Sequence, residues 1–313
     1  MKPSIVIPQF LAEADIQDQS RALYDFSIRK FFLWVHANNI DPDNINRADL
    51  IKYKKQLQNS GLSISTVKNY LTIVRIFFSW ASQNGIHDDV MVGIKSPRYD
   101  NTYKRYPLTG DQVKQLLNSI DRSTEIGARD YALILLMVFN GLRRLEVSAI
   151  NVSDIVVDGE KQGIYIKGKG RLEKDQFIKI TDSSVDAIND YLVLRKVFDD
   201  KDPLFTSTYS TTKGKRLEAS SITRVIKKRM RAIDLDSKYY TCHSLRHTAA
   251  CLLLSNGFDL HKVQLFMRHK SPATTQLYTR VIDEQIRLEN EAGNTLEKLI
   301  SINHKNTIET INK

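Results

Sequence analysis

The spacing of apolar residues most constrains how this chain can fold, because it is helical over most of the length and is interrupted in only two short regions. The clearest stripe occupies eight positions of the first hundred residues: Ile64, Val67, Tyr70, Leu71, Val74, Phe77, Phe78 and Ala81. Steps of three and four residues put these side chains on one face of a helix. Ser63 or Ser65 can cap its start and Gly85 can end it.

Two more helices are predicted in the same region. One contains the apolar positions Leu23, Phe26, Phe31 and Val35, and another begins near Asn46 and contains Leu50, Tyr53 and Leu57. Five aromatic side chains are expected to pack in the core of this region: Phe31, Phe32, Phe77, Phe78 and Trp80. Residues 1–95 are therefore predicted to form a small helical domain.

The helical periodicity stops in the segment KSPRYDNTYKRYP, which contains two prolines. Its basic residues are Lys95, Arg98, Lys104 and Arg105. We interpret residues 96–107 as a basic interdomain linker. The segment either follows phosphates along a duplex or is a solvated connector, and its composition favours neither.

A second region begins at residue 108, where Thr109 can cap a helix. Strands are predicted at 155–157, 164–166 and 177–180, with Asp158-Gly159 and Gly168-x-Gly170 as turns. Helices are predicted at 109–117, 128–140, just after Gly141, and at 183–197, 221–233, 243–255, 260–268, 272–280 and 284–300. The predicted fold is mainly helical with one small antiparallel sheet. Residues 108–283 form the second domain, and 284–313 form a C-terminal helix and tail.

The charge balance indicates a polyanionic partner. Lys and Arg number 46 against 36 Asp and Glu, which gives a net charge of +10 and an isoelectric point near 9.4. No apolar run approaches the roughly 20 residues of a spanning helix, and the N-terminus lacks the pattern of a signal peptide. The only cysteines, Cys242 and Cys251, cannot build a disulfide framework. We expect a cytoplasmic protein without membrane association.

Four separated segments hold cationic or imidazole groups that local structure would fix in place: NGLRRLEV, KGKGR, HSLRH and MRHKSPATTQLYTR. His243 and Arg246 are three residues apart and share a helix face. Two guanidinium groups around one phosphorus would stabilise the extra charge of a pentacoordinate transition state. Each segment alone is weak evidence for a functional site, because HxxR on a helix is usually an exposed polar face and Gly-Lys-Gly is usually just a hairpin turn. Tyr278 alone would more often be core or surface.

Together, and in this order, the four segments resemble the tyrosine recombinase family, the phage integrases and Xer-like recombinases. NGLRRLEV resembles the family's first box, KGKGR its β-hairpin lysine segment, and HSLRHTAACLLLSNG with MRHKSPATTQLYTR its second box. The resemblance implies six catalytic residues: Arg143, Lys169, His243, Arg246, His269 and Tyr278. Met267-Arg268 departs from the more frequent Leu-Gly before the histidine, and Arg280 stands where a His often follows the tyrosine.

The same resemblance implies a two-domain, C-shaped clamp around DNA. Residues 1–95 would be the core-site DNA-binding domain and 108–283 the catalytic domain, and we expect no arm-site module before them. The C-terminal segment has a broken apolar stripe: Ile282, Ile286, Leu288, Leu296, Leu299 and Ile300. It either folds back on its own domain or docks into an adjacent protomer, as the resemblance favours.

Each site residue then has an expected role. Tyr278 is the nucleophile, and its phenol, with an ordinary pKa of about 10, needs nearby positive charge and a proton acceptor. Lys169 would protonate the leaving 5′ oxygen, and His243 would be the acid/base partner of the tyrosine. His269 would donate a hydrogen bond to the phosphate. We expect Glu146 to orient groups behind the phosphate site or to form a helix salt bridge.

One histidine is expected to stay outside the site. His247 lies one residue past Arg246 and so on another helix face, which favours structural packing. DNA contacts are expected from six basic residues outside the catalytic groups: Lys68, Arg75, Lys95, Arg98, Lys104 and Arg105.

No cofactor and no metal site is expected, because the chain has no Mg²⁺-type carboxylate cluster, no zinc spacing and no GxxxxGK[ST] loop. The predicted function is site-specific recombination of double-stranded DNA with inverted half-sites, through a 3′-phosphotyrosine, by a tetramer on two DNA sites. Integration, excision and dimer resolution all use this chemistry. A type IB topoisomerase-like activity and a non-catalytic DNA-binding regulator on the same fold are the alternatives.

Overall fold

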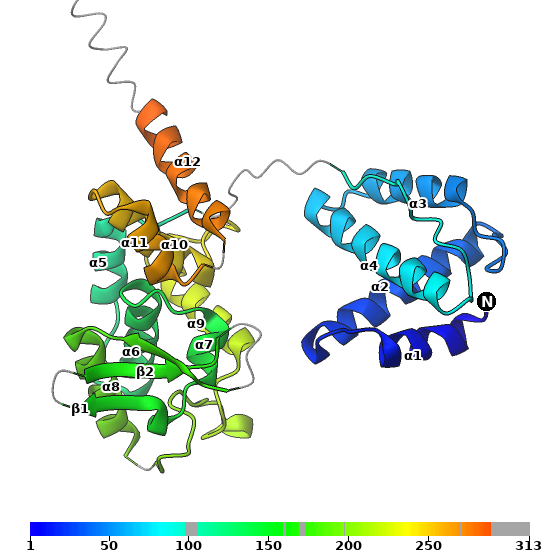
Figure 1. The fold of residues 1–313 in the computed structure, drawn as a ribbon. Helices are drawn as coiled ribbons and strands as arrows, with labels where there is room; N and C mark the ends of the chain where they lie inside the picture. Colours follow the sequence, from blue (N-terminus) through cyan, green and yellow to red (C-terminus); the bar gives the residue numbers. More distant parts are fainter. Residues whose placement is uncertain (98–105, 159–160, 169–172, 197, 270, 289–313) are drawn as a thin grey trace, which may run out of the picture. The chain divides into compact units, whose positions relative to one another are not determined.

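A computed structural model of the chain divides into two units, Met1–Asn101 and Thr102–Lys313, each with its own hydrophobic core. The structure describes residues 1–97, 106–158, 161–168, 173–196, 198–269 and 271–288. Helices dominate both units (Figure 1). No helix in these described ranges is both long and apolar enough to cross a membrane.

The first unit contains four helices, α1 (Pro3–Glu13), α2 (Asp18–Ala37), α3 (Arg47–Asn59) and α4 (Ile64–Gln83). Helix α4 packs against the other three. Its core is aromatic: the Phe77 ring meets Phe10 and Phe32 edge-on, with ring centroids 5.3 and 5.6 Å apart. The five aromatic side chains assigned to the core from the sequence are all buried, which confirms that prediction.

Helix α1 was not predicted. Its prolines hid the pattern, although Pro3 occupies the first turn, where the missing N–H costs nothing, and only Pro8 lies inside the helix. The helix buries Val6, Ile7 and Phe10 against its neighbours. Burial of this apolar face outweighs the loss of one helical hydrogen bond at Pro8.

Three helices begin where the sequence predicts a start, two of them at residues predicted as caps. The side chain of Asn46 accepts hydrogen bonds from the backbone at the start of α3, in a capping box with Asp49. Ser63, rather than Ser65, caps α4 through a 3.2 Å bond from Thr66 N. Thr109 caps α5 (Gly110–Asn118) in the second unit. Each side-chain oxygen satisfies an N–H group that the helix leaves unpaired.

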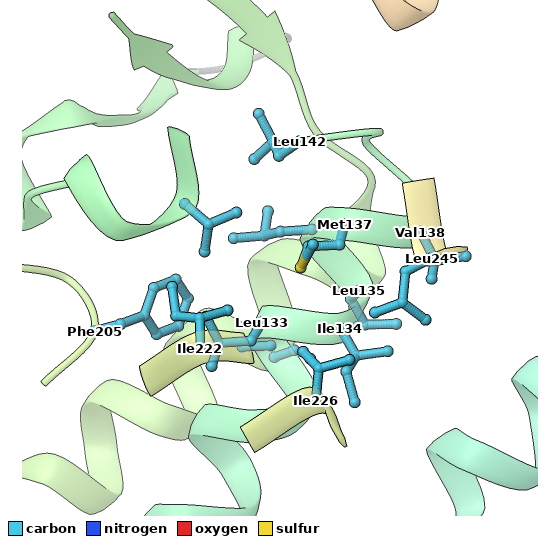
Figure 2. Packing of buried hydrophobic residues seen from close by; sticks show 14 of the residues in the cluster. Leu133, Ile134, Leu135, Met137, Val138, Leu142, Phe205, Ile222, Ile226 and Leu245 are labelled. Atoms are coloured by element: carbon cyan, nitrogen blue, oxygen red, sulfur yellow. The ribbon is translucent and has the colours of Figure 1, made fainter. Parts of the chain in front are cut away.

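The second unit surrounds one long apolar helix, α6 (Glu125–Val138), which is buried over most of its length. Figure 2 shows α6 side chains such as Leu133 and Ile134 packed with Phe205, Ile222 and Ile226. The remaining helices are α7 (Arg144–Ala149), α8 (Asp182–Arg195), α9 (Ala219–Arg231), α10 (Cys242–Ser255), α11 (Leu260–Met267) and α12 (Pro272–Leu288).

A three-stranded antiparallel sheet interrupts these helices, with β1 (Ile155–Asp158), β2 (Lys161–Ile166) and β3 (Gln176–Lys179) in that order. Gly163 on β2 has no room for a side chain, because a Cβ there would lie 2.4 Å from the Ile178 carbonyl oxygen. The prediction of a mainly helical, two-domain chain with one small sheet is confirmed.

Helix α12 differs from the sequence prediction. Two separate helices were expected, at 272–280 and 284–300, but one helix runs unbroken from Pro272 to Leu288. The apolar stripe is irregular around Asp283, yet Asp283 and its neighbours do not stop a helix as Pro or Gly would. The tail from 289 onward lies outside the described residues.

Candidate active site

A sharp turn after α6 positions the first arginine. Gly141 has φ +58°, and a Cβ there would lie 3.0 Å from the Phe266 ring, so both backbone and space require glycine. The chain then enters α7 with Arg143 as its N-cap residue. Glu146 fixes this turn, because its two carboxylate oxygens accept 2.7 Å bonds from the backbone N and the Nη1 of Arg143.

The second arginine meets the first at the end of α11. Arg246 on α10 is buried, and its guanidinium donates to the carbonyl oxygens of Gly141 and Met267. Arg143 Nη2 lies 3.5 Å from the same Met267 oxygen and 3.2 Å from that of Arg268. Backbone carbonyls at a helix C-terminus carry partial negative charge, which suits both cations. The structure therefore brings Arg143, Arg246 and Glu146 together.

Burial and neighbouring charges shift the pKa values of these groups. Burial, followed by the charges of Arg143 and Arg268, lowers the pKa of Arg246 to about 9. Burial alone would raise the pKa of Glu146, but Arg268 and Arg143 outweigh it, so the pKa of this carboxyl is lowered. Glu146 is thus a carboxylate held between two guanidinium groups.

Tyr278 lies on α12 in a small apolar cluster with Ala250, Cys251, Val263 and Met267, and it is 2% exposed. Burial raises the pKa of its phenol, and the charges of Arg246 and Arg143 act in the opposite direction. The tyrosine is therefore within the electrostatic reach of both arginines while protonated. This placement puts the predicted nucleophile near the two arginines that are predicted to bind the phosphate.

Two imidazoles lie against Tyr278. His247 Nδ1 is 2.7 Å from the tyrosine Oη, and the His269 ring stacks at 5.9 Å between centroids. Burial lowers the pKa of His247 to about 3, and burial together with Arg246 and Arg143 lowers the pKa of His269 to about 4. Both rings are neutral at pH 7, so each can exchange hydrogen bonds with a phenol or a phosphate. His269 Nδ1 is also 2.9 Å from Thr275 Oγ1.

The remaining predicted groups are less closely placed. His243 is exposed on α10, one turn before His247, with their ring centroids 6.3 Å apart. Lys169, in the segment between β2 and β3, lies outside the described residues. Within the described part of the chain, no group of three or more His, Cys, Asp or Glu side chains could hold a metal ion.

Sequence reasoning missed two contacts. His247 was expected to pack away from the site, but α12 crosses α10 so that this second face of α10 also meets Tyr278. Arg268 was treated only as a departure from a pattern, yet its guanidinium binds Glu146 Oε2 at 2.9 Å. No signal in a single sequence reveals the crossing of α10 and α12, whereas a charged residue in place of the usual glycine could have drawn attention to Arg268.

The proposed DNA contacts in the first unit are mixed. Lys68 and Lys95 are exposed. Arg75 is half-buried, and its Nη2 donates to the Ile94 carbonyl oxygen at 2.8 Å, which ties it to its own unit. The other three, Arg98, Lys104 and Arg105, lie outside the described residues.

Comparisons with known proteins identify the family of the chain. The sequence pattern described as "Phage integrase family" matches residues 107–285, and "Phage integrase, N-terminal SAM-like domain" matches residues 8–88. The first of these covers more than half of the chain. The chain belongs to the phage integrase family. It is a tyrosine recombinase, an enzyme of DNA recombination.

Relatives of this recombinase include Tyrosine recombinase XerC of Neisseria meningitidis, 31% identical over 257 residues that cover 80% of each chain. Tyrosine recombinase XerD of Listeria innocua is 29% identical over 247 residues, covering 77% of this chain and 80% of its own.

Solved structures share the fold. A XerH site-specific recombinase bound to palindromic difH substrate, in a post-cleavage complex, aligns with a TM-score of 0.70 at 23% identity over 92% of this chain and 80% of that chain. The pre-cleavage complex of XerH with difH aligns with a TM-score of 0.62 at 25% identity, over 86% and 78%.

Proposed function

We propose that this recombinase cleaves the two DNA sites between which it exchanges strands, and that Tyr278 is the nucleophile. The phenolate oxygen attacks the scissile phosphorus, an O–P bond to the tyrosine forms, and the bond to the 5′ oxygen breaks. The 5′ hydroxyl of a partner strand then attacks the same phosphorus. A new phosphodiester forms, and the bond to the tyrosine oxygen breaks. The observation that carries the proposal is the placement of Tyr278 Oη beside His247 and within the electrostatic reach of Arg143 and Arg246.

Arg143 and Arg246 would hold the phosphate. Each guanidinium is fixed on one side by backbone carbonyls or Glu146, and Arg143 stays 30% exposed. Five N–H donors per guanidinium leave Arg143 at least two for a phosphate after its bonds to Glu146, Met267 and Arg268. Preorganised donors of this kind stabilise charge that develops in the transition state.

Three further residues would manage protons and hydrogen bonds. Lys169 would protonate the leaving 5′ oxygen from the segment between β2 and β3. His243 would accept the tyrosine proton, and His269 would donate to a non-bridging oxygen of the phosphate. The phosphotyrosine conserves the bond energy, so rejoining needs no ATP.

DNA-bound recombinase would act as a tetramer on two sites with inverted half-sites, in the cytoplasm and at the nucleoid. An apolar cavity of about 800 Å³ in the second unit supports this assembly. It is lined by Val113, Leu117, Phe139, Leu252, Phe258 and Phe266. We assign it to the apolar C-terminal segment of an adjacent protomer. Lys68 and Lys95, with the linker cations, would contact the backbone of each half-site, and Arg75 would add to them with the N–H donors that its bond to Ile94 leaves over.

The first experiment traps the covalent intermediate. Duplexes bound by the protein are selected from random fragments, and a nicked version of the selected site lets the 5′ product diffuse away. Wild-type protein should then accumulate a DNA adduct on a denaturing gel, in EDTA as well as in its absence. Tyr278→Phe should form none but bind the site within a few fold, whereas Tyr240→Phe should form it normally. An adduct in Tyr278→Phe would refute the assignment.

The second experiment removes the C-terminal segment. A chain ending at Asp283 should bind a single half-site normally but lose cooperative filling of a full site, and recombination with it. If the shortened chain fills both half-sites as cooperatively as the full chain, the segment is not the connector. Relaxation of a supercoiled plasmid without exchange would instead indicate a topoisomerase.

A further inference from the structure

Glu146 is the only acidic group that contacts the arginine cluster among the described residues. Its side chain is 5% exposed, and it binds Arg143 through Oε1 and Arg268 through Oε2. A buried carboxylate close to a phosphate would repel it unless its own charge is balanced. The cation that balances the charge of Glu146 therefore determines how much positive charge the arginines can offer to DNA.

Arg268 is built into this cluster at a cost to stability. Its backbone is left-handed, with φ 52° and ψ 45°, a conformation that favours glycine. Its side chain is 9% exposed, and its buried Nε has no hydrogen-bond partner among the described residues. Strain and an unsatisfied donor at one residue point to a function beyond capping α11.

The bonds of Arg268 tie three parts of the site together. Nη2 donates to Glu146 Oε2 and to the Gly141 carbonyl oxygen, each at 2.9 Å. The backbone carbonyl oxygen of Arg268 itself accepts a 3.2 Å bond from Arg143 Nη2. Gly141 also accepts from Arg246. Arg268 thus contacts Arg143 and Glu146 directly, and it shares the Gly141 carbonyl oxygen with Arg246.

The charges give a simple balance. Three guanidinium groups and one carboxylate leave two positive charges uncompensated. If Arg268 cancels Glu146, both remaining charges belong to Arg143 and Arg246. A phosphodiester carries one negative charge, and its pentacoordinate transition state gains a second. The cluster then matches the transition state better than the bound substrate, as catalysis requires.

We infer that Arg268 is a positioning residue for strand cleavage: it neutralises Glu146 and fixes it against Arg143, so that Arg143 and Arg246 offer their full charge to the phosphate. This inference rests on the function proposed above. The same chain supplies a matched ion pair away from the site, since Asp130 is buried between Arg129 and Arg229 with N···O distances of 2.8 and 2.7 Å.

The test measures single-turnover cleavage of the nicked site at saturating protein, with half-site binding and thermal unfolding recorded for each variant. Arg268→Gln should cleave about tenfold more slowly, because Glu146 then withdraws charge from Arg143. Arg268→Lys should stay within about threefold of wild type, since it keeps the charge. Combining Arg268→Gln with Glu146→Gln should restore cleavage toward wild type, because no uncompensated carboxylate remains.

A second readout is specific for charge. A substrate with a neutral methylphosphonate at the scissile position demands less positive charge, so the slowing caused by Arg268→Gln should shrink toward onefold. The control Arg229→Gln should lower the unfolding temperature but leave cleavage of both substrates unchanged.

The outcomes separate this inference from the proposed function. Wild-type protein that forms no Tyr278 adduct would overturn the proposed function itself. Wild-type protein that forms the adduct, together with an Arg268→Gln variant that unfolds earlier but cleaves at the wild-type rate, would show that Arg268 only stabilises the fold. Equal slowing of Arg268→Gln on the charged and the neutral phosphorus would also overturn the inference.

Discussion

The two units bury different kinds of side chain. Among the described residues, two polar or charged side chains are buried in the first unit, Ser27 and Asp49, against twelve in the second. The first unit is held by aromatic rings, and Asp49 serves a helix end. The second keeps Arg246 and Glu146 inside, at a cost that a purely structural core would avoid. The difference teaches that part of what the second unit buries serves the site, as Arg246 and Glu146 do, while other buried polar groups such as Asp130 lie away from it.

This contrast predicts that mutations in the first unit act on stability. Phe77→Ala removes a fully buried ring that touches Phe10 and Phe32, and it should destabilise that unit by about 3–5 kcal/mol. The chain has two tryptophans, Trp34 and Trp80, both in the first unit, so tryptophan fluorescence in urea reports its unfolding alone. Phe77→Leu, the control, should cost much less. Equal unfolding midpoints for Phe77→Ala and wild type would break the comparison.

In the second unit, a change that keeps charge should still slow the chemistry strongly. Arg246→Lys cannot reproduce a planar fork, and loss of preorganised donors should slow cleavage about 10²–10³-fold while DNA binding persists. Arg195→Lys is the matched control, because the Arg195 side chain is only 7% exposed and also donates to backbone carbonyl oxygens, those of Pro203 and Leu204. Single-turnover cleavage measures both. Near wild-type cleavage by Arg246→Lys would remove it from the clamp.

Prediction from the sequence succeeded where a local pattern decides the structure. The apolar stripe of α4 and the caps at Asn46, Ser63 and Thr109 each involve residues within a few positions of one another. The sheet and most helices of the second unit followed for the same reason. Helix α1 was missed because proline is a strong local signal against a helix. Burial of side chains such as Phe10 outweighs that signal in the folded unit.

The site could be predicted only in part. The resemblance supplied Arg143, Arg246 and Tyr278, whose placement requires a fold that brings three distant segments together. It could not supply the contact of His247 with Tyr278, which depends on the crossing of two helices. It also gave Arg268 no role, because its bond to Glu146 joins positions 122 residues apart.

The polar groups that cap helices in the first unit should act only locally. Asn46→Ala removes the capping box of α3, in which Asn46 Oδ1 accepts from Ala48 N at 2.9 Å, and it should cost about 1 kcal/mol. Asn46→Asp keeps an acceptor and should cost less. Tryptophan fluorescence in urea measures both, and cleavage should not change. A loss of cleavage larger than the loss of DNA binding would show that this unit also shapes the chemistry.

The smallest expected effect is the one that pH has near neutrality, and it belongs to the second unit. His247 has a pKa lowered by burial to about 3, so the unfolded chain takes up its proton first as the pH falls below about 6.5. Its contribution to stability is present above that value and is lost as the pH falls toward 3, by roughly 0.8 kcal/mol already at about pH 6. Circular dichroism follows the unfolding of the second unit, which the tryptophans do not report. In His247→Gln, the stability of that unit should depend less on pH. The control His87→Gln, in the other unit, should leave that transition unchanged. An unaltered pH dependence in His247→Gln would mean that His247 can accept a proton in the folded chain, and that its contact with Tyr278 is open to water.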